Sequence, residues 1–103
     1  MKNLKGKRLE FIKNSFNTGD NYCVLGAIGD KAEGNPYLFE DLCEHKNLAQ
    51  SRTPVKVLGK TITKGSLVSL MNLNDSGRWE RLTRRLMEFG LYDKVKKYAI
   101  RVF

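Results

Sequence analysis

The sequence lacks any apolar run that approaches the roughly 20 residues a membrane-spanning helix needs. Its basic segment 1–8 leads into no uninterrupted apolar stretch of the kind found in secretory signals. Internal repeats, linkers and low-complexity segments are also missing. The content of 41% hydrophobic and 29% charged residues is ordinary for a folded chain. We therefore expect a single domain over residues 1–103 that is located in the cytoplasm and contacts no membrane.

Cysteine and histidine are scarce, with two cysteines, Cys23 and Cys43, and one histidine, His45. The Cys43-x-His45 pair lacks the spacing of zinc modules, and acidic residues one helical turn apart, Asp30 and Glu33, are typical of solvated surface. We therefore expect no metal site. On a helix His45 would point away from Cys43 and could not act as its base. We expect both cysteines to be free, buried thiols, because a reducing compartment disfavours disulfides.

The sequence also contains no glycine-rich phosphate-binding loop after a predicted strand, so nothing in it supports nucleotide hydrolysis. It contains no nucleophile paired with a base and no recognisable cofactor motif. We therefore expect a binding protein that uses no cofactor and is not an enzyme.

Charge is abundant and unevenly spread. The net charge of +8 divides into +4 over residues 1–16, −4 over 17–50 and +8 over 51–103. A basic balance favours nucleic acid or another polyanion as a partner. The acidic middle segment would repel phosphates unless it faces away from them. This division allows the two ends of the molecule to meet different partners, or the protein to form homo-oligomers.

The segment 66–90 has the clearest structural pattern. It predicts a short apolar helix over 66–73, a polar turn over 74–77 and a longer amphipathic helix over 78–89 that stops at Gly90. The last helix has an apolar stripe that we expect to pack on the core. The stripe consists of Trp79, Leu82, Leu86 and Phe89.

The same helix has an arginine face. Four arginines recur near helical spacing: Arg78, Arg81, Arg84 and Arg85. One interpretation is a solvated surface, partly neutralised by Glu80 and Glu88. The other is a contact surface, because the guanidinium group is a fixed fork of donors that pairs with carboxylates and phosphates. We take the four arginines as the candidate partner-binding residues.

The remaining pattern predicts an α+β fold that is mainly helical, with four to five helices. Val55–Leu58 and Thr61–Thr63 flank Gly59-Lys60 and predict a small hairpin with glycine first in its turn. Residues 98–103 alternate enough for an edge strand, although Leu91, Val95, Tyr98 and Val102 also fit a helix. Further helices are expected over 4–16, 22–33 and 37–45, with a brief helix or turn over 91–97. The expected core consists of Leu25, Ile28, Leu42, Leu70, Leu82 and Leu86, with Trp79 near its edge.

Two short sequence blocks carry a resemblance to known proteins. They read Tyr22-Cys23-Val24-Leu25-Gly26-Ala27 and Leu70-x-x-Leu73-Asn74-Asp75-Ser76-Gly77. Together they resemble a loose group of small uncharacterised phage and prophage proteins. In that group the second block precedes an acidic amphipathic helix, whereas here the helix carries arginines. The resemblance implies a phage accessory protein that binds host machinery, and it brings no catalytic residues with it.

Two functional classes follow. The first is an inhibitor or adaptor that occupies an acidic surface of a host enzyme, defence complex or nucleoprotein complex. The second is a nucleic-acid-binding module in which segment 66–90 forms a helix-turn-helix and its arginines contact phosphates or bases. We favour the first, because Asp75 would lie beside the recognition helix and the pattern lacks the usual tight turn.

Overall fold

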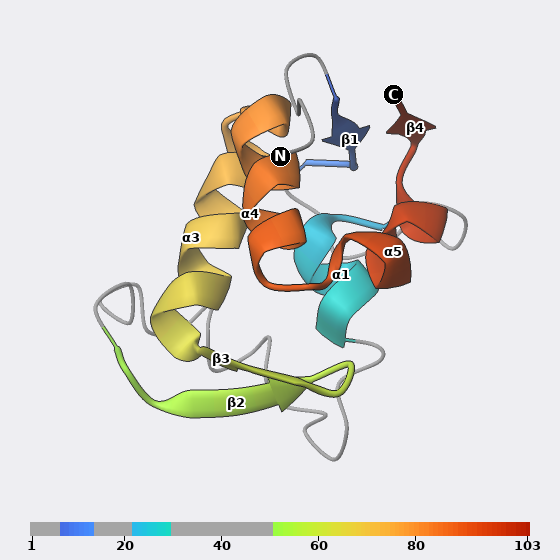
Figure 1. Cartoon of the computed structure of the whole chain (residues 1–103). Coiled ribbons are helices and arrows are strands. Elements are labelled where there is room, and N and C mark those ends of the chain that lie inside the picture. Colours follow the sequence, from blue (N-terminus) through green and yellow to red (C-terminus); the bar gives the residue numbers. More distant parts are fainter. Residues whose placement is uncertain (1–6, 14–21, 30–50) are drawn as a thin grey trace.

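The computed structural model describes residues 7–13, 22–29 and 51–103. These residues form an α+β fold that is mainly helical, with two small antiparallel sheets of two strands each (Figure 1). The predicted fold class is confirmed. No helix among the described residues is both long and apolar enough to cross a bilayer.

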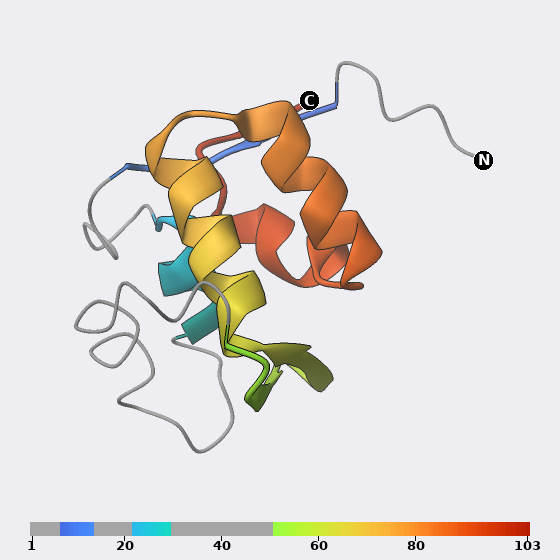
Figure 2. The same cartoon turned by 90° about the vertical axis from the view of Figure 1, so that its left-hand side faces the viewer.

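Two helices form the centre of the fold: α3, Lys64–Asp75, and α4, Trp79–Glu88. They run in nearly opposite directions in both views, as an antiparallel helical hairpin (Figures 1 and 2). A three-residue turn joins them, and its Gly77 has a φ of +70°, which glycine adopts without steric cost. The turn predicted over 74–77 therefore begins two residues too early, because α3 continues to Asp75, and it ends one residue too early, because α4 begins at Trp79.

The α3 helix begins earlier than its apolar pattern indicates. Thr63 caps it, since its hydroxyl accepts the N–H of Ser66 at 3.1 Å. The predicted start at Ser66 is therefore two residues late. The end of α4 agrees with the prediction. Gly90, just past this helix, has a φ of +73° and is therefore in the left-handed conformation.

A β-hairpin leads directly into α3. It consists of β2, Pro54–Val57, and β3, Lys60–Thr63, paired antiparallel. The predicted hairpin is confirmed, but its turn lies one residue earlier than expected. Leu58 and Gly59 occupy the two central positions with φ values of +52° and +79°. Positive φ at both positions is typical of a type I′ turn, whose twist matches that of the strands.

The helix predicted over 4–16 is wrong where the structure describes it. The chain there contains β1, Leu9–Glu10, which pairs antiparallel with β4, Arg101–Val102. Leu9 and Phe11 are buried while Glu10 between them is partly exposed. This alternation has the two-residue period of a strand, which the sequence interpretation missed. The predicted edge strand near the C-terminal end is confirmed at Arg101–Val102.

Three short helical segments complete the described fold: α1, Val24–Gly29, α5, Tyr92–Val95, and the 3₁₀ helix η2, Lys96–Tyr98. They confirm the central part of the helix predicted over 22–33 and the brief helix predicted over 91–97.

The core lies between α1, the α3–α4 hairpin, α5 and the strand β1. Five of the predicted core residues are fully buried there, and Trp79 lies partly buried at the edge as expected. The five are Leu25, Ile28, Leu70, Leu82 and Leu86. The sixth, Leu42, lies with the helix predicted over 37–45 outside the described residues.

Candidate functional site

The arginines of α4 lie on the face opposite its core contacts. Leu82, Thr83 and Leu86 are buried, and this contact fixes how the helix is turned about its axis. The four arginines are exposed. Three of them border hollows in the groove between α3 and α4, whereas Arg78 precedes the helix and borders neither hollow.

The first hollow, which we call the arginine hollow, has a volume of about 430 Å³. The described residues that line it are three arginines, one residue with a carboxylate, one with a hydroxyl and one partly buried leucine. These are Arg81, Arg84, Arg85, Glu88, Ser69 and Leu73. The structure therefore brings three of the four predicted arginines to one site.

The charge of the arginine hollow is only weakly neutralised. Its carboxylate, Glu88, contacts Arg85 at 3.4 Å, and both side chains are about half exposed. Such a surface pair contributes roughly 0–1 kcal/mol, so a ligand can displace it. No ion pair joins Arg81 or Arg84 to another residue within the part of the chain that the structure describes. The sequence predicted that Glu88 partly neutralises the arginine face, and the structure pairs it with Arg85.

The second hollow, which we call the hydroxyl hollow, has a volume of about 300 Å³ and adjoins the first. The two hollows share Ser69 and Arg85, so they lie next to each other along the groove between α3 and α4. The hydroxyl hollow is lined by Arg52 as well as Arg85, and none of the described residues that line it carries a carboxylate. Ser51, Thr63, Ser66 and Ser69 contribute hydroxyl groups to it, and Gly65 and Phe89 also line it.

The start of α3 lies at the hydroxyl hollow, but its backbone N–H groups already have acceptors. Lys64 N–H donates to the carbonyl of Thr53 at 2.9 Å, and Gly65 N–H donates to that of Ser51 at 3.0 Å. The N–H of Ser66 is bound by the Thr63 hydroxyl. A ligand in this hollow would therefore be held by side chains rather than by unpaired helix amides.

The helical hairpin differs from a DNA-reading helix-turn-helix. In that motif the two helices cross at about 90–120°, which lets the second helix enter the major groove. Here α3 and α4 are nearly antiparallel (Figure 2). Arg81, Arg84 and Arg85 thus border a groove shared with α3 instead of standing on a projecting helix.

The two sequence blocks that carry the phage-protein resemblance meet in the structure. Asn74, which is 1% exposed, accepts the N–H of Val24 at 3.0 Å and donates to the carbonyl of Ile12 at 2.9 Å. The sequence pattern had predicted Asn74 in a polar turn. Its buried contacts give the two blocks a structural role, and membership of the phage group stays a prediction.

Cys23 is a free, buried thiol, as predicted. Burial raises its pKa, and its sulfur accepts the N–H of Gly26 at 3.2 Å at the start of α1. Cys43 and the other residues considered for a metal site, His45, Asp30 and Glu33, lie outside the described residues, so those predictions stay untested.

Sequence reasoning missed the α3 side of the groove. Ser66 and Ser69 are polar residues three apart in the mainly apolar stretch 66–71, and this interruption of the apolar pattern was the available signal. No sequence pattern indicated that Arg52 belongs to the site, because Arg52 lies far from α4 in the sequence and only the fold places it beside the groove.

No family model matches the chain, and the searches of curated proteins and of solved structures found no match.

Proposed function

We propose that this protein acts by binding, and that the arginine hollow holds an acidic segment of another protein. One observation carries the proposal: three guanidinium groups, those of Arg81, Arg84 and Arg85, line a single hollow to which the described residues contribute one carboxylate. A guanidinium binds a carboxylate through two parallel hydrogen bonds, which gives both strength and geometric selectivity.

The shape of the site favours a protein segment over duplex DNA. A duplex offers its phosphates on a convex backbone and is read by a helix that projects into a groove. The arginines of α4 instead border a concave surface shared with α3, which a narrow side chain or segment can enter. The partly buried Leu73 lines the same hollow and offers apolar contact to that segment.

The wider role that we propose is that of a phage-type accessory protein in the host cytoplasm. It would inhibit or modulate a host protein or nucleoprotein complex by covering an acidic surface, without a catalytic step. The support is the resemblance of the two sequence blocks together with the basic groove. Self-association through the acidic segment 17–50 and nucleic-acid binding are the competing outcomes.

The test compares two variants with equal charge changes in different places. Arg81→Gln/Arg84→Gln alters the arginine hollow, whereas Lys94→Gln/Lys97→Gln alters exposed lysines of α5 and η2. Each protein is used to capture partners from a nuclease-treated bacterial lysate, and the identified partner is then titrated in pure form. We expect the first variant to bind it at least about tenfold more weakly, and the second to bind as the wild type does.

Three results would contradict the proposal. One is equal binding by both variants. Another is submicromolar affinity for duplex DNA at physiological salt with a steep salt slope that Arg81→Gln/Arg84→Gln lowers. The third is a concentration-dependent mass in sedimentation that the same variant abolishes, which would assign the hollow to self-association. Matched thermal melts would show that both variants are folded.

A further inference from the structure

The hydroxyl hollow contains more hydrogen-bond donors than a carboxylate can use. Arg52 and Arg85 each carry five N–H donors, and hydroxyl groups of α3 lie beside them. The Thr63 and Ser66 hydroxyls are 2.9 Å apart and share one hydrogen bond, which leaves a second proton available. Ser69 makes no side-chain hydrogen bond to the rest of the described chain.

A phosphomonoester matches this donor set. It presents three strong acceptor oxygens and a charge of about −1.5 to −2 at pH 7, whereas a carboxylate presents two oxygens and a single charge. We propose that the hydroxyl hollow binds the phosphoryl group of a phosphorylated serine or threonine in the partner segment. This inference rests on the proposed function, because the same segment would continue into the arginine hollow.

The backbone holds Arg52 at this position. Its two neighbours, Ser51 and Thr53, accept hydrogen bonds from the first turn of α3 through their carbonyls, so the segment is fixed against that helix. Arg85 reaches the same hollow from α4. Two guanidinium groups from separate elements therefore border the hollow, as in other sites that bind phosphorylated residues.

The lining is also suited to a phosphoryl group that is attached to a peptide. Gly65 has no side chain to fill the hollow, and the half-buried Phe89 provides an apolar surface beside the arginines. The groove follows α3 from Ser66 to Leu73, about 10 Å at the helical rise per residue. An extended peptide covers that length in about three residues. The acidic residues should thus lie about three positions from the phosphorylated one.

The experiment follows backbone amide shifts in ¹⁵N-labelled protein during titration with three synthetic peptides. The first contains phosphoserine followed by glutamates at positions +2 to +4, and its twins contain serine or glutamate in place of phosphoserine. We expect the phosphopeptide to bind at least about tenfold more tightly than either twin, with shifts at Ser66 and Ser69. Its affinity should rise between pH 5 and pH 7, as the phosphate loses its second proton near pH 6.

Variants separate this inference from the proposed function. Arg52→Gln should remove the preference for the phosphopeptide, and Arg101→Gln, an equal charge change on β4, should retain it. Arg81→Gln/Arg84→Gln should weaken the phosphopeptide and its twins alike. If Arg52→Gln changes nothing while that double variant still loses its lysate partner, the inference fails and the proposed function stands.

Other outcomes would overturn the inference directly. Equal affinity for all three peptides, or no shift with millimolar phosphopeptide, would mean that the hollow does not select a phosphoryl group. Tighter binding of adenosine monophosphate than of the phosphopeptide would assign the hydroxyl hollow to nucleotides.

One outcome would instead keep the inference and reject the proposed function. In it, Arg81→Gln/Arg84→Gln still prefers the phosphopeptide and still captures its lysate partner as the wild type does.

Discussion

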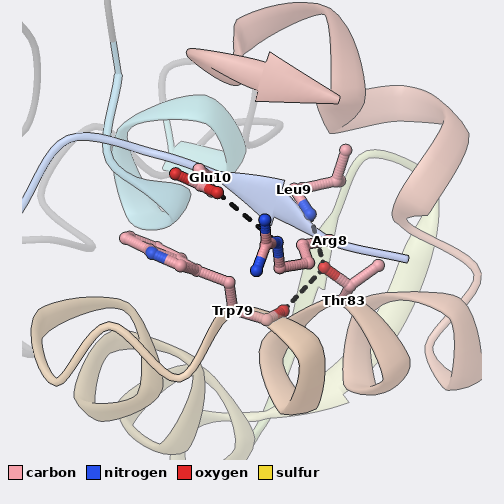
Figure 3. Close-up of polar contacts among 5 residues, drawn as sticks. All are labelled: Arg8, Leu9, Glu10, Trp79 and Thr83. Atoms are coloured by element: carbon pink, nitrogen blue, oxygen red, sulfur yellow. Dashed lines mark hydrogen bonds and ion pairs between the residues drawn. The ribbon is translucent and has the colours of Figure 1, made fainter. Parts of the chain in front are cut away.

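Thr83 and Asn74 are buried polar residues that connect the N-terminal segment and α1 to the helical hairpin. The Thr83 hydroxyl accepts the N–H of Leu9 at 2.6 Å and donates to the carbonyl of Trp79 at 2.7 Å (Figure 3). Leu9 thus gains a partner for a backbone group that would otherwise be buried without one, because that N–H does not face β4. Asn74 does the same for Val24 and Ile12.

We predict that Thr83→Val lowers the free energy of unfolding by about 1–3 kcal/mol. Valine has nearly the same shape as threonine, so the loss comes from the unsatisfied N–H of Leu9 rather than from a cavity. Urea denaturation measures it. Thr61→Val, on the exposed side of β3, is the control and should change stability by less than about 0.5 kcal/mol. Equal effects of the two substitutions would refute the role of Thr83.

Cys23 makes the free energy of unfolding depend on pH, and the direction of this dependence follows from its raised pKa. Burial, with a smaller contribution from Asp75, raises the thiol pKa in the folded state. Above about pH 8.5 the unfolded thiol ionises while the folded one keeps its proton. The stability that Cys23 contributes is therefore complete below that pH and is lost as the pH rises further. We expect the free energy of unfolding to fall less steeply above pH 8.5 in Cys23→Ala, and parallel curves would disprove this.

At the scale of elements, the sequence predicts best where one helix carries both its apolar stripe and its end signals. This holds for α4, whose core side and terminal glycine were both predicted. The strand β1 could not be predicted in the same way. Leu9 is buried through its contacts with β4 and α4, which lie far along the chain, and the apolar residues around it also suit a helical period.

The hairpin turn offers a test of backbone conformation alone. Gly59 has a φ of +79°, and apart from Gly59 and its two chain neighbours no heavy atom of the described residues lies within 4 Å of the position that a Cβ would occupy. Gly59→Ala should therefore destabilise the protein by about 1 kcal/mol through conformational strain and not through a clash. Gly59→Asn should cost less, because asparagine tolerates this conformation. A thermal melt in which alanine and asparagine behave alike would contradict the assigned turn.

At the scale of the whole molecule, the candidate site was predictable on one side only. The arginines follow from the sequence of α4, since a helix determines which of its residues share a face. The opposite side depends on tertiary packing, which places Arg52 and the serines of α3 beside Arg85. No local sequence pattern indicates that these residues lie beside Arg85.

The net charge of +8 should make stability depend on salt. Like charges in the folded state repel one another, and salt screens that repulsion with a Debye length of about 10 Å at 0.1 M. We expect the melting temperature to rise between 20 and 200 mM sodium chloride. Arg81→Gln/Arg84→Gln should melt higher than the wild type at low salt and gain less from added salt. A melting temperature that falls with salt would show that attractive ion pairs dominate instead.

The pairing of β1 with β4 has a consequence for the order of folding. It joins Leu9 to Val102, so it closes a loop that contains nearly the whole chain, whereas α3–α4 and β2–β3 form from neighbouring residues. Long-range closure costs chain entropy before its contacts form, and local hairpins form faster. The β1–β4 contacts should therefore be absent from the transition state. Weakening them should speed unfolding in stopped-flow experiments and leave the refolding rate nearly unchanged. The lifetime of the native state, rather than the speed of reaching it, would then depend on this last-formed sheet.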